Sequence, residues 1–84
     1  MSQYDTMEEL IGFVASNQKS GKVLAVLDSK GAMDSATIAK TTRVVGVDKI
    51  LEELVSKKLI GRSGEKYTLT DLGTQVSRKL RGVR

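Results

Sequence analysis

Two residue types that carry much of protein chemistry are missing here: the chain of 84 residues contains no cysteine and no histidine. Without thiols the protein can form neither a disulfide framework nor a thiolate metal site. Without histidine it has no imidazole ligand and no imidazole general base. These absences exclude zinc fingers and Cys/His metal sensors, and they exclude every catalytic scheme that depends on a histidine base.

Proline is also absent, so glycine and helix-capping residues must mark the ends of the structural elements. No apolar run approaches the roughly 18–20 residues that span a bilayer. The N-terminal segment MSQYDTMEEL is acidic and polar, which is unlike a secretory signal. We therefore expect a cytoplasmic protein, or a nuclear one if the source is a eukaryote, without a membrane partner.

The length of the chain limits what kind of site it can hold. Eighty-four residues make one domain with a modest core, which leaves little interior volume for a deep substrate pocket. Hydrophobic residues make up 39% and charged residues 29%, the composition of an ordinary globular protein. The sequence shows no nucleophile–base pair, no metal cluster and no phosphate-binding loop. We therefore expect neither enzyme activity nor a cofactor.

Charge is distributed unevenly along the chain, whose net charge is +4. Residues 1–56 carry six Lys/Arg and eight Asp/Glu, a balance of −2, whereas residues 57–84 carry eight and two, a balance of +6. A basic C-terminal third indicates a polyanionic partner such as nucleic acid. The alternative is that these cations only keep the surface soluble.

Apolar spacing predicts four helices before residue 59. They are expected over Met7–Ser16, Gly21–Ser29, Ser35–Thr41 and about 46–58. The fourth has the clearest signature, with apolar residues at i, i+3, i+4, i+7 and i+8 counted from Val47. Thr6, Ser20 and Asp34 are the predicted N-caps, and Gly31 is a predicted C-cap.

After residue 58 the apolar period changes to that of strands. Residues 59–63 and 66–69 read as two short strands, and Gly64 suits the first central position of a two-residue type II′ turn, where φ is positive. A last helix follows, with Thr70 as its N-cap. The pattern predicts a mostly helical α+β fold: a helix-turn-helix with a short β-hairpin wing and extra helices at both ends.

Two stretches of the chain carry a family pattern. One begins with IAK at 38–40 and continues through Val47 and ILEEL at 50–54 to KKLI at 57–60. The other is YTLTDLG at 67–73. Together, and in this order, they resemble the winged-helix DNA-binding family, in particular its small MarR- and ArsR-like prokaryotic regulators.

The resemblance covers about residues 20–80, and it implies how the chain is divided. We expect a single winged-helix domain over 1–84, in which 1–18 form an accessory N-terminal helix. Only eight positions separate Ala39 from Val47, which is shorter than the usual family spacing. Either a short turn therefore precedes the recognition helix, or the recognition helix begins later.

The resemblance implies a recognition helix in the major groove of double-stranded DNA and a wing on its backbone or minor groove. The polar side chains expected near the start of the recognition helix are Lys40, Thr42, Arg43 and Lys49. Those expected at the wing tip are Arg62, Ser63 and Lys66. Arg43 is the best candidate for a bidentate contact to guanine, and the wing cations suit phosphates. Solvated surface charge, or protection of an exposed hairpin edge, is the alternative reading.

Other residues argue for modest base reading. The predicted recognition helix also carries Asp48, Glu52 and Glu53. Val44 and Val45, both expected to be exposed, offer no hydrogen bonds, although they can touch thymine methyl groups. These features favour an alternative function, a winged-helix protein–protein interaction module within a larger complex. Binding of RNA or of left-handed duplex by the same fold is a third hypothesis.

The helices at the two ends of the chain have more apolar surface than a minimal winged helix needs. Either helix is a candidate homodimer interface, and a dimer would place two recognition helices on a palindromic DNA site. Packing of the first helix onto its own domain is the alternative. Tyr67 is interpreted as a core aromatic residue whose hydroxyl reaches the surface. The C-terminal cations are candidates for phosphate contacts or for a solvated helix end: Arg78, Lys79, Arg81 and Arg84.

Overall fold

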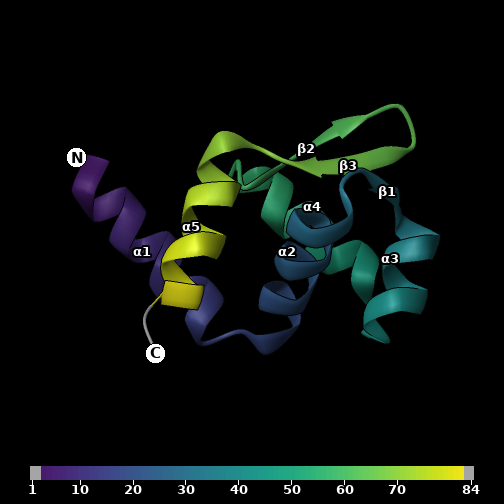
Figure 1. Cartoon of the computed structure of the whole chain (residues 1–84), viewed down its shortest axis with the longest axis horizontal. Coiled ribbons are helices and arrows are strands. Elements are labelled where there is room, and N and C mark those ends of the chain that lie inside the picture. Colours follow the sequence, from purple (N-terminus) through teal and green to yellow (C-terminus); the bar gives the residue numbers. More distant parts are fainter. Residues whose placement is uncertain (1–2, 83–84) are drawn as a thin grey trace.

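The computed structural model describes the backbone of residues 3–82 and the side chains of residues 7–80. Over this range the chain is a mostly helical α+β structure with a three-stranded antiparallel sheet (Figure 1). Its elements, in order, are α1 (Gln3–Ala15), α2 (Gln18–Lys30), β1 (Met33–Asp34), α3 (Ser35–Thr42), α4 (Val47–Ser56), β2 (Ile60–Ser63), β3 (Lys66–Leu69) and α5 (Asp71–Gly82). The expected α+β class is confirmed. No helix in the described range has the length and apolar character needed to cross a membrane.

Two predicted helix caps in the middle of the chain are confirmed. The Asp34 carboxylate accepts a hydrogen bond from the Thr37 backbone N–H at 2.8 Å and starts α3. Gly31 ends α2 with a φ of 85°, and its N–H bonds to the Leu27 carbonyl at 2.9 Å. Both caps act within four residues along the chain, which is why sequence alone identifies them.

Two predicted helix starts are wrong. α2 begins at Gln18 because Asn17, rather than Ser20, is its N-cap; the Asn17 Oδ1 accepts from the Ser20 N–H at 3.4 Å. Asn is at least as good a cap as Ser, and the intervening Gln and Lys favour helix. α1 begins at Gln3, ahead of the predicted cap Thr6, since no residue between them breaks a helix.

α4 ends at Ser56, earlier than predicted, because Lys58 adopts the left-handed conformation with a φ of 65°. The Lys58 N–H bonds to the Val55 carbonyl at 2.9 Å, and the Leu59 N–H bonds to the Leu54 carbonyl at 3.0 Å. This is a Schellman closure with Lys where Gly is usual. Leu54 and Leu59 are fully buried, so their packing holds the closure in place.

The β2–β3 hairpin forms as predicted. Its register pairs Ser63 with Lys66, so Gly64 and Glu65 are the two turn residues. Gly64 has a φ of 63°, whereas Glu65 is not among the positive-φ residues. Positive φ at the first central residue alone is the type II′ pattern.

The third strand, β1, was not predicted. It has only two residues, and it joins the sheet in the order β1–β3–β2 by pairing Met33 with Tyr67 and Asp34 with Lys66. Two residues are too few to show alternation, and Asp34 also caps the following helix. The strand therefore depends on its partner β3 rather than on a local signal.

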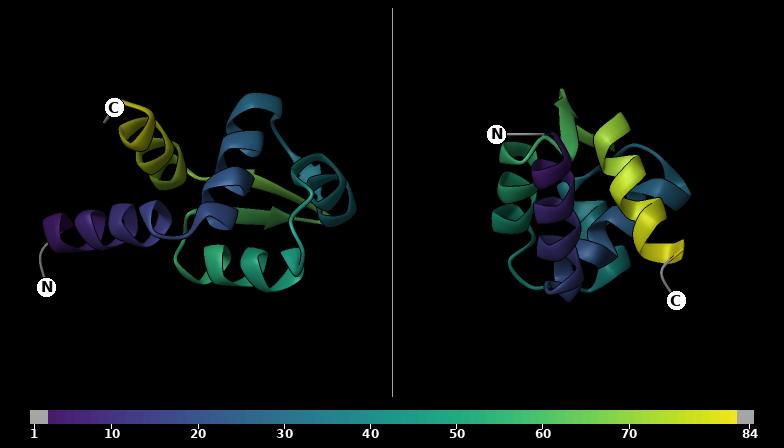
Figure 2. Two further views of the ribbon diagram at one scale, coloured as in Figure 1. Left: turned by 90° about the horizontal axis from the view of Figure 1, so that it is seen from below. Right: turned by 90° about the vertical axis from the view of Figure 1, so that its left-hand side faces the viewer.

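The core lies between the helices and one face of the sheet. Its least exposed apolar side chains come from four helices and from the segment that enters β2: Val23, Leu24, Ile38, Leu51, Leu54, Leu59, Ile60 and Val76. α1 adds Leu10 and Val14, exposed by 6% and 3%, and so packs on its own domain. Its N-terminal end extends beyond the body of the molecule (Figure 2).

Thr70 and Gly73 join α5 tightly to the end of α4 and the start of β2. The Thr70 hydroxyl donates to the Lys58 carbonyl at 2.7 Å and lies 3.0 Å from the Leu59 carbonyl, while it accepts from the Gly73 N–H at 3.0 Å. The predicted N-cap is thus confirmed. A Cβ at Gly73 would collide with the Leu59 carbonyl oxygen, so no larger residue fits without displacing the backbone.

Candidate nucleic-acid interface

The turn between α3 and α4, residues 43–46, is short, which is one of the two outcomes that the spacing allows. Arg43 and Gly46 are both left-handed, with φ values of 58° and 74°. The Arg43 N–H bonds to the Ala39 carbonyl at 2.8 Å and ends α3, and the Gly46 carbonyl accepts from the Ile50 N–H at 3.4 Å at the start of α4. Two left-handed residues let four residues turn the chain between two helices.

Arg43 stands where glycine would be easier. The left-handed conformation costs a residue with a Cβ about 1–2 kcal/mol. The Arg43 side chain is exposed, so burial of its stem does not compensate for that cost. The left-handed Arg43 closes α3, as the left-handed Lys58 closes the end of α4, so the backbone conformation alone assigns it no function. Its exposed charge at the turn keeps Arg43 among the candidates for DNA contact.

The two valines of this turn differ in exposure, and the prediction for one of them is wrong. Val44 is only 8% exposed and belongs to the core together with Val47. Val45 is 81% exposed. The left-handed residue before Val44 turns the chain so that its side chain points inward, which spacing alone does not indicate.

Thr42 contributes to the shape of the turn. Its hydroxyl donates to the Ile38 carbonyl at 2.7 Å and accepts from the Val44 N–H at 3.3 Å, and its side chain is half-buried. Its bonding capacity is thus used largely within the protein. Lys40 lies on α3 and is exposed.

The exposed face of α4 is acidic on balance. Lys49 is exposed as predicted, but Asp48, Glu52 and Glu53 are exposed beside it, which gives these four residues a net charge of −2. Lys49 and the two glutamates line one shallow hollow with Ser56. Carboxylates can accept hydrogen bonds from cytosine, but they repel phosphates. The exposed face of α4, its first turn included, is therefore a poor place for contacts with the DNA backbone.

The hairpin separates its two cations. Arg62 pairs with Tyr67, whereas Lys66 pairs with Ser63 on one side and Asp34 on the other. Because neighbouring rows of a sheet project to opposite faces, the side chains of Arg62 and Lys66 leave the hairpin on opposite sides. A partner that lies against one face of the hairpin can contact Arg62 or Lys66 closely, but not both.

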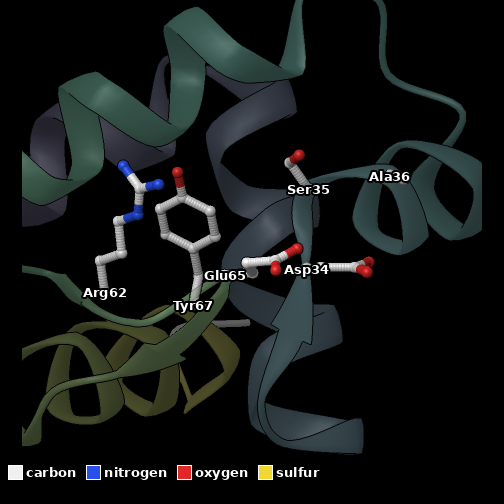
Figure 3. Close-up of a pocket in the computed structure, with 6 residues that line it drawn as sticks. All are labelled: Asp34, Ser35, Ala36, Arg62, Glu65 and Tyr67. Carbon is white, nitrogen blue, oxygen red and sulfur yellow. The ribbon is translucent and has the colours of Figure 1, made fainter.

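Arg62 is held against its cross-strand partner. Its Cζ lies 5.8 Å from the centroid of the Tyr67 ring, within cation–π range, and its Nε donates to the Gly64 carbonyl at 3.1 Å. Figure 3 shows the guanidinium group beside the Tyr67 ring, with both side chains rising from the same strand pair. Arg62 is thus positioned by the hairpin itself, although it is exposed.

Two hollows meet at this pair of side chains. The first lies between the hairpin and α4 and is lined by Glu52, Val55, Ser56, Arg62 and Tyr67. The second lies between the hairpin and the start of α3 and is lined by Asp34, Ser35, Ala36, Arg62, Glu65 and Tyr67 (Figure 3). Since Glu52 and Ser56 also line the hollow at Lys49, one continuous surface joins Lys49 to Arg62.

Lys66 has an acidic neighbour in the sheet. Hydrogen bonds from the hydroxyl and the backbone N–H of Thr37 lower the pKa of Asp34, and the positive charge of Lys66 lowers that pKa further. Asp34 therefore stays ionised beside Lys66 and offsets part of its charge. Arg62 has acidic neighbours as well, because Glu52 lines one of its hollows and Asp34 and Glu65 line the other.

Sequence reasoning missed the role of Tyr67 toward Arg62. Tyr67 is half-buried and packs against the core, and it also supplies the ring on which Arg62 rests. A two-residue turn at Gly64 fixes the pairing of 62 with 67 by counting outward from the turn. Counting outward from the predicted turn would therefore have identified Tyr67 as the cross-strand partner of Arg62.

The remaining candidate cations lie on α5. Arg78 and Lys79 are exposed, whereas the Arg81 side chain and Arg84 lie outside the described residues. α5 packs against α1 and α2. In the part of the chain that the structure describes, no three acidic side chains gather closely enough to hold a metal ion.

Comparison of the chain with protein-family models, with curated proteins and with solved structures finds no match. Function must therefore be inferred from the side chains described above.

Proposed function

We propose that the protein is a winged-helix protein that binds double-stranded DNA as a transcriptional regulator in the cytoplasm. Two helices joined by a short turn, followed by a β-hairpin, support this reading, with α4 as recognition helix and the hairpin as wing. One observation carries the proposal: Arg62 of the hairpin and Lys49 of α4 lie on one continuous surface. A duplex lying against α4 would meet a cation of the wing.

Three exposed cations lie on or beside this surface: Arg43 at the turn, Lys49 on α4 and Arg62 on the hairpin. Because Arg43 is also the candidate for a guanine contact and carboxylates surround Lys49, three phosphate contacts are the upper limit. Each phosphate neutralised on duplex DNA lowers the slope of log affinity against log salt by about 0.9. The slope should therefore lie between about −0.9, for Arg62 alone, and about −2.7, for all three cations. Affinity should fall by about threefold to 40-fold between about 50 and 200 mM salt.

The test is a titration of labelled generic duplex DNA, followed by fluorescence anisotropy at several salt concentrations. Arg62→Ala should weaken binding and reduce the salt slope by about one. Lys66→Ala is the matched control, because it removes one cation from the opposite face of the same hairpin, and its effect should be smaller. Absence of salt-dependent binding by the wild-type protein would overturn the proposed function.

A second candidate function has its own supporting observation. The exposed face of α4 carries Asp48, Glu52 and Glu53 against the single cation Lys49. Such a face suits a basic protein surface better than a phosphate backbone. A protein-interaction module would use α4 to dock a basic partner, and the same titration would then show no binding of duplex DNA.

A further inference from the structure

Val45 is the most exposed large apolar side chain in the described part of the chain. In the described part of the chain only two large apolar side chains are exposed, Val45 at 81% and Val55 at 37%. Val44 and Val47 on either side of Val45 are 8% exposed each. Val45 is therefore directed into solvent alone.

The backbone around Val45 presents this side chain in a preset direction. Left-handed residues flank the pair Val44–Val45, with Arg43 before it and Gly46 after it. The Val44 N–H is bonded to the Thr42 hydroxyl at 3.3 Å, and the Val44 side chain is anchored in the core. A β-branched side chain also has few rotamers to lose. A contact through Val45 would thus need little ordering on binding.

The surroundings of Val45 do not suit a protein partner. A stable protein interface buries about 800 Å² on each side around an apolar centre. The other exposed valine, Val55, lies near the far end of α4, on the order of 12 Å along the helix from Val47. One isolated apolar side chain fits a ligand that offers one small apolar group.

Double-stranded DNA offers one such group in the major groove. Among the base edges there, only thymine presents a methyl group, at C5, and guanine beside it would offer the acceptors that Arg43 can bind. We propose that Val45 is a specificity-determining residue that contacts the 5-methyl group of a thymine. The assignment rests on the proposed function, because it requires the leading end of α4 to enter the major groove.

The experiment uses deoxyuridine, which differs from thymidine only by this methyl group. A duplex enriched from a random pool by the wild-type protein is prepared with thymine and again with uracil at every thymine position. The wild-type protein should bind the thymine duplex about fourfold more tightly, the ratio expected for one buried methyl group. Val45→Ala should abolish that preference, and Val55→Ala, the matched control, should keep it.

The double comparison removes effects of uracil on the shape of DNA, since these act on both protein variants alike. An equal thymine preference in the wild-type protein and Val45→Ala would overturn the assignment, and so would a selected site without a required thymine. In either case salt-dependent binding would persist and the proposed function would stand. Failure of the wild-type protein to bind any duplex would overturn both.

Discussion

Replacing Gly73 by alanine tests how closely α5 must approach the strand that precedes it. The new Cβ would collide with the Leu59 carbonyl oxygen and would lie 3.1 Å from the Leu69 Cδ2. The colliding atom belongs to the backbone, so it cannot move away as a flexible side chain can. α5 would have to shift, which would strain the hydrogen bonds that Thr70 makes to the Lys58 and Leu59 carbonyls.

The change in the free energy of unfolding for Gly73→Ala is the difference between destabilising and stabilising contributions. Overpacking of this kind costs about 1–3 kcal/mol, and each strained hydrogen bond adds up to about 1 kcal/mol. Alanine returns up to about 1 kcal/mol through its better helix propensity. The net loss in the free energy of unfolding should be about 2–3 kcal/mol, a fall in Tm of roughly 8–24 °C for a domain of this size.

Gly12→Ala is the matched control, because the same chemical change is made in a helix where a Cβ would meet nothing within 4 Å. It should stabilise the protein by about 0.5–1 kcal/mol. Thermal unfolding of both variants, monitored by circular dichroism, tests whether Gly73→Ala lowers Tm while Gly12→Ala raises it. If Gly73→Ala were as stable as the wild-type protein, the close contact between α5 and Leu59 would be wrong.

Two further predictions concern the hairpin and its neighbour. Tyr67→Leu removes the ring on which Arg62 rests but keeps the Arg62 charge, so DNA binding should weaken about two- to fivefold, the value of an exposed cation–π contact, and the salt slope should change less than in Arg62→Ala. Tyr67→Phe keeps the ring and should bind normally. Adding Tyr67→Leu to Arg62→Ala should weaken binding no further, and additive losses would show that Tyr67 does not act through Arg62. The second prediction concerns the lowered pKa of Asp34 in the folded state. Ionised Asp34 should stabilise the folded protein at pH values above 3.8, the ordinary pKa of the group, and this contribution should be lost as the pH falls below 3.8 through the folded pKa. Asp34→Asn keeps a capping oxygen but cannot titrate, so acid unfolding should show a smaller loss of stability over that range; parallel curves for both proteins would contradict the assigned linkage.

Local chemistry explains which parts of the fold were predictable. The cap at Asp34, the cap at Thr70 and the turn at Gly64 each depend on atoms within a few residues, and each is found as predicted. β1 depends on pairing with a strand more than thirty positions later, so no local pattern reveals it. The start of α2 was misplaced because Asn17 and Ser20 are both good caps, and the structure uses the earlier of the two.

The residue types of the candidate site could be predicted from the sequence, but the orientations of its side chains could not. Val44 and Val45 are chemically identical, and the left-handed backbone at Arg43 decides which one is buried. Thr42 was selected for its hydroxyl, which the structure uses to shape the turn. Directions of this kind depend on a few backbone dihedral angles in an irregular turn, where hydrophobic periodicity carries no information.

The distribution of charge over the proposed reading surface has a consequence for how it would recognise DNA. Asp48 in the first turn of α4 and Glu52 and Glu53 further along it disfavour a close approach of phosphates to this helix, whereas Arg43 and Val45 precede it and Arg62 lies on the hairpin beside it. Attraction would therefore act at the turn before α4 and at the wing, with repulsion between them. Such a surface would bind a duplex at two separated points. Base recognition should come mainly from the turn before α4, and affinity should depend on contact between the hairpin and the phosphate backbone of the DNA.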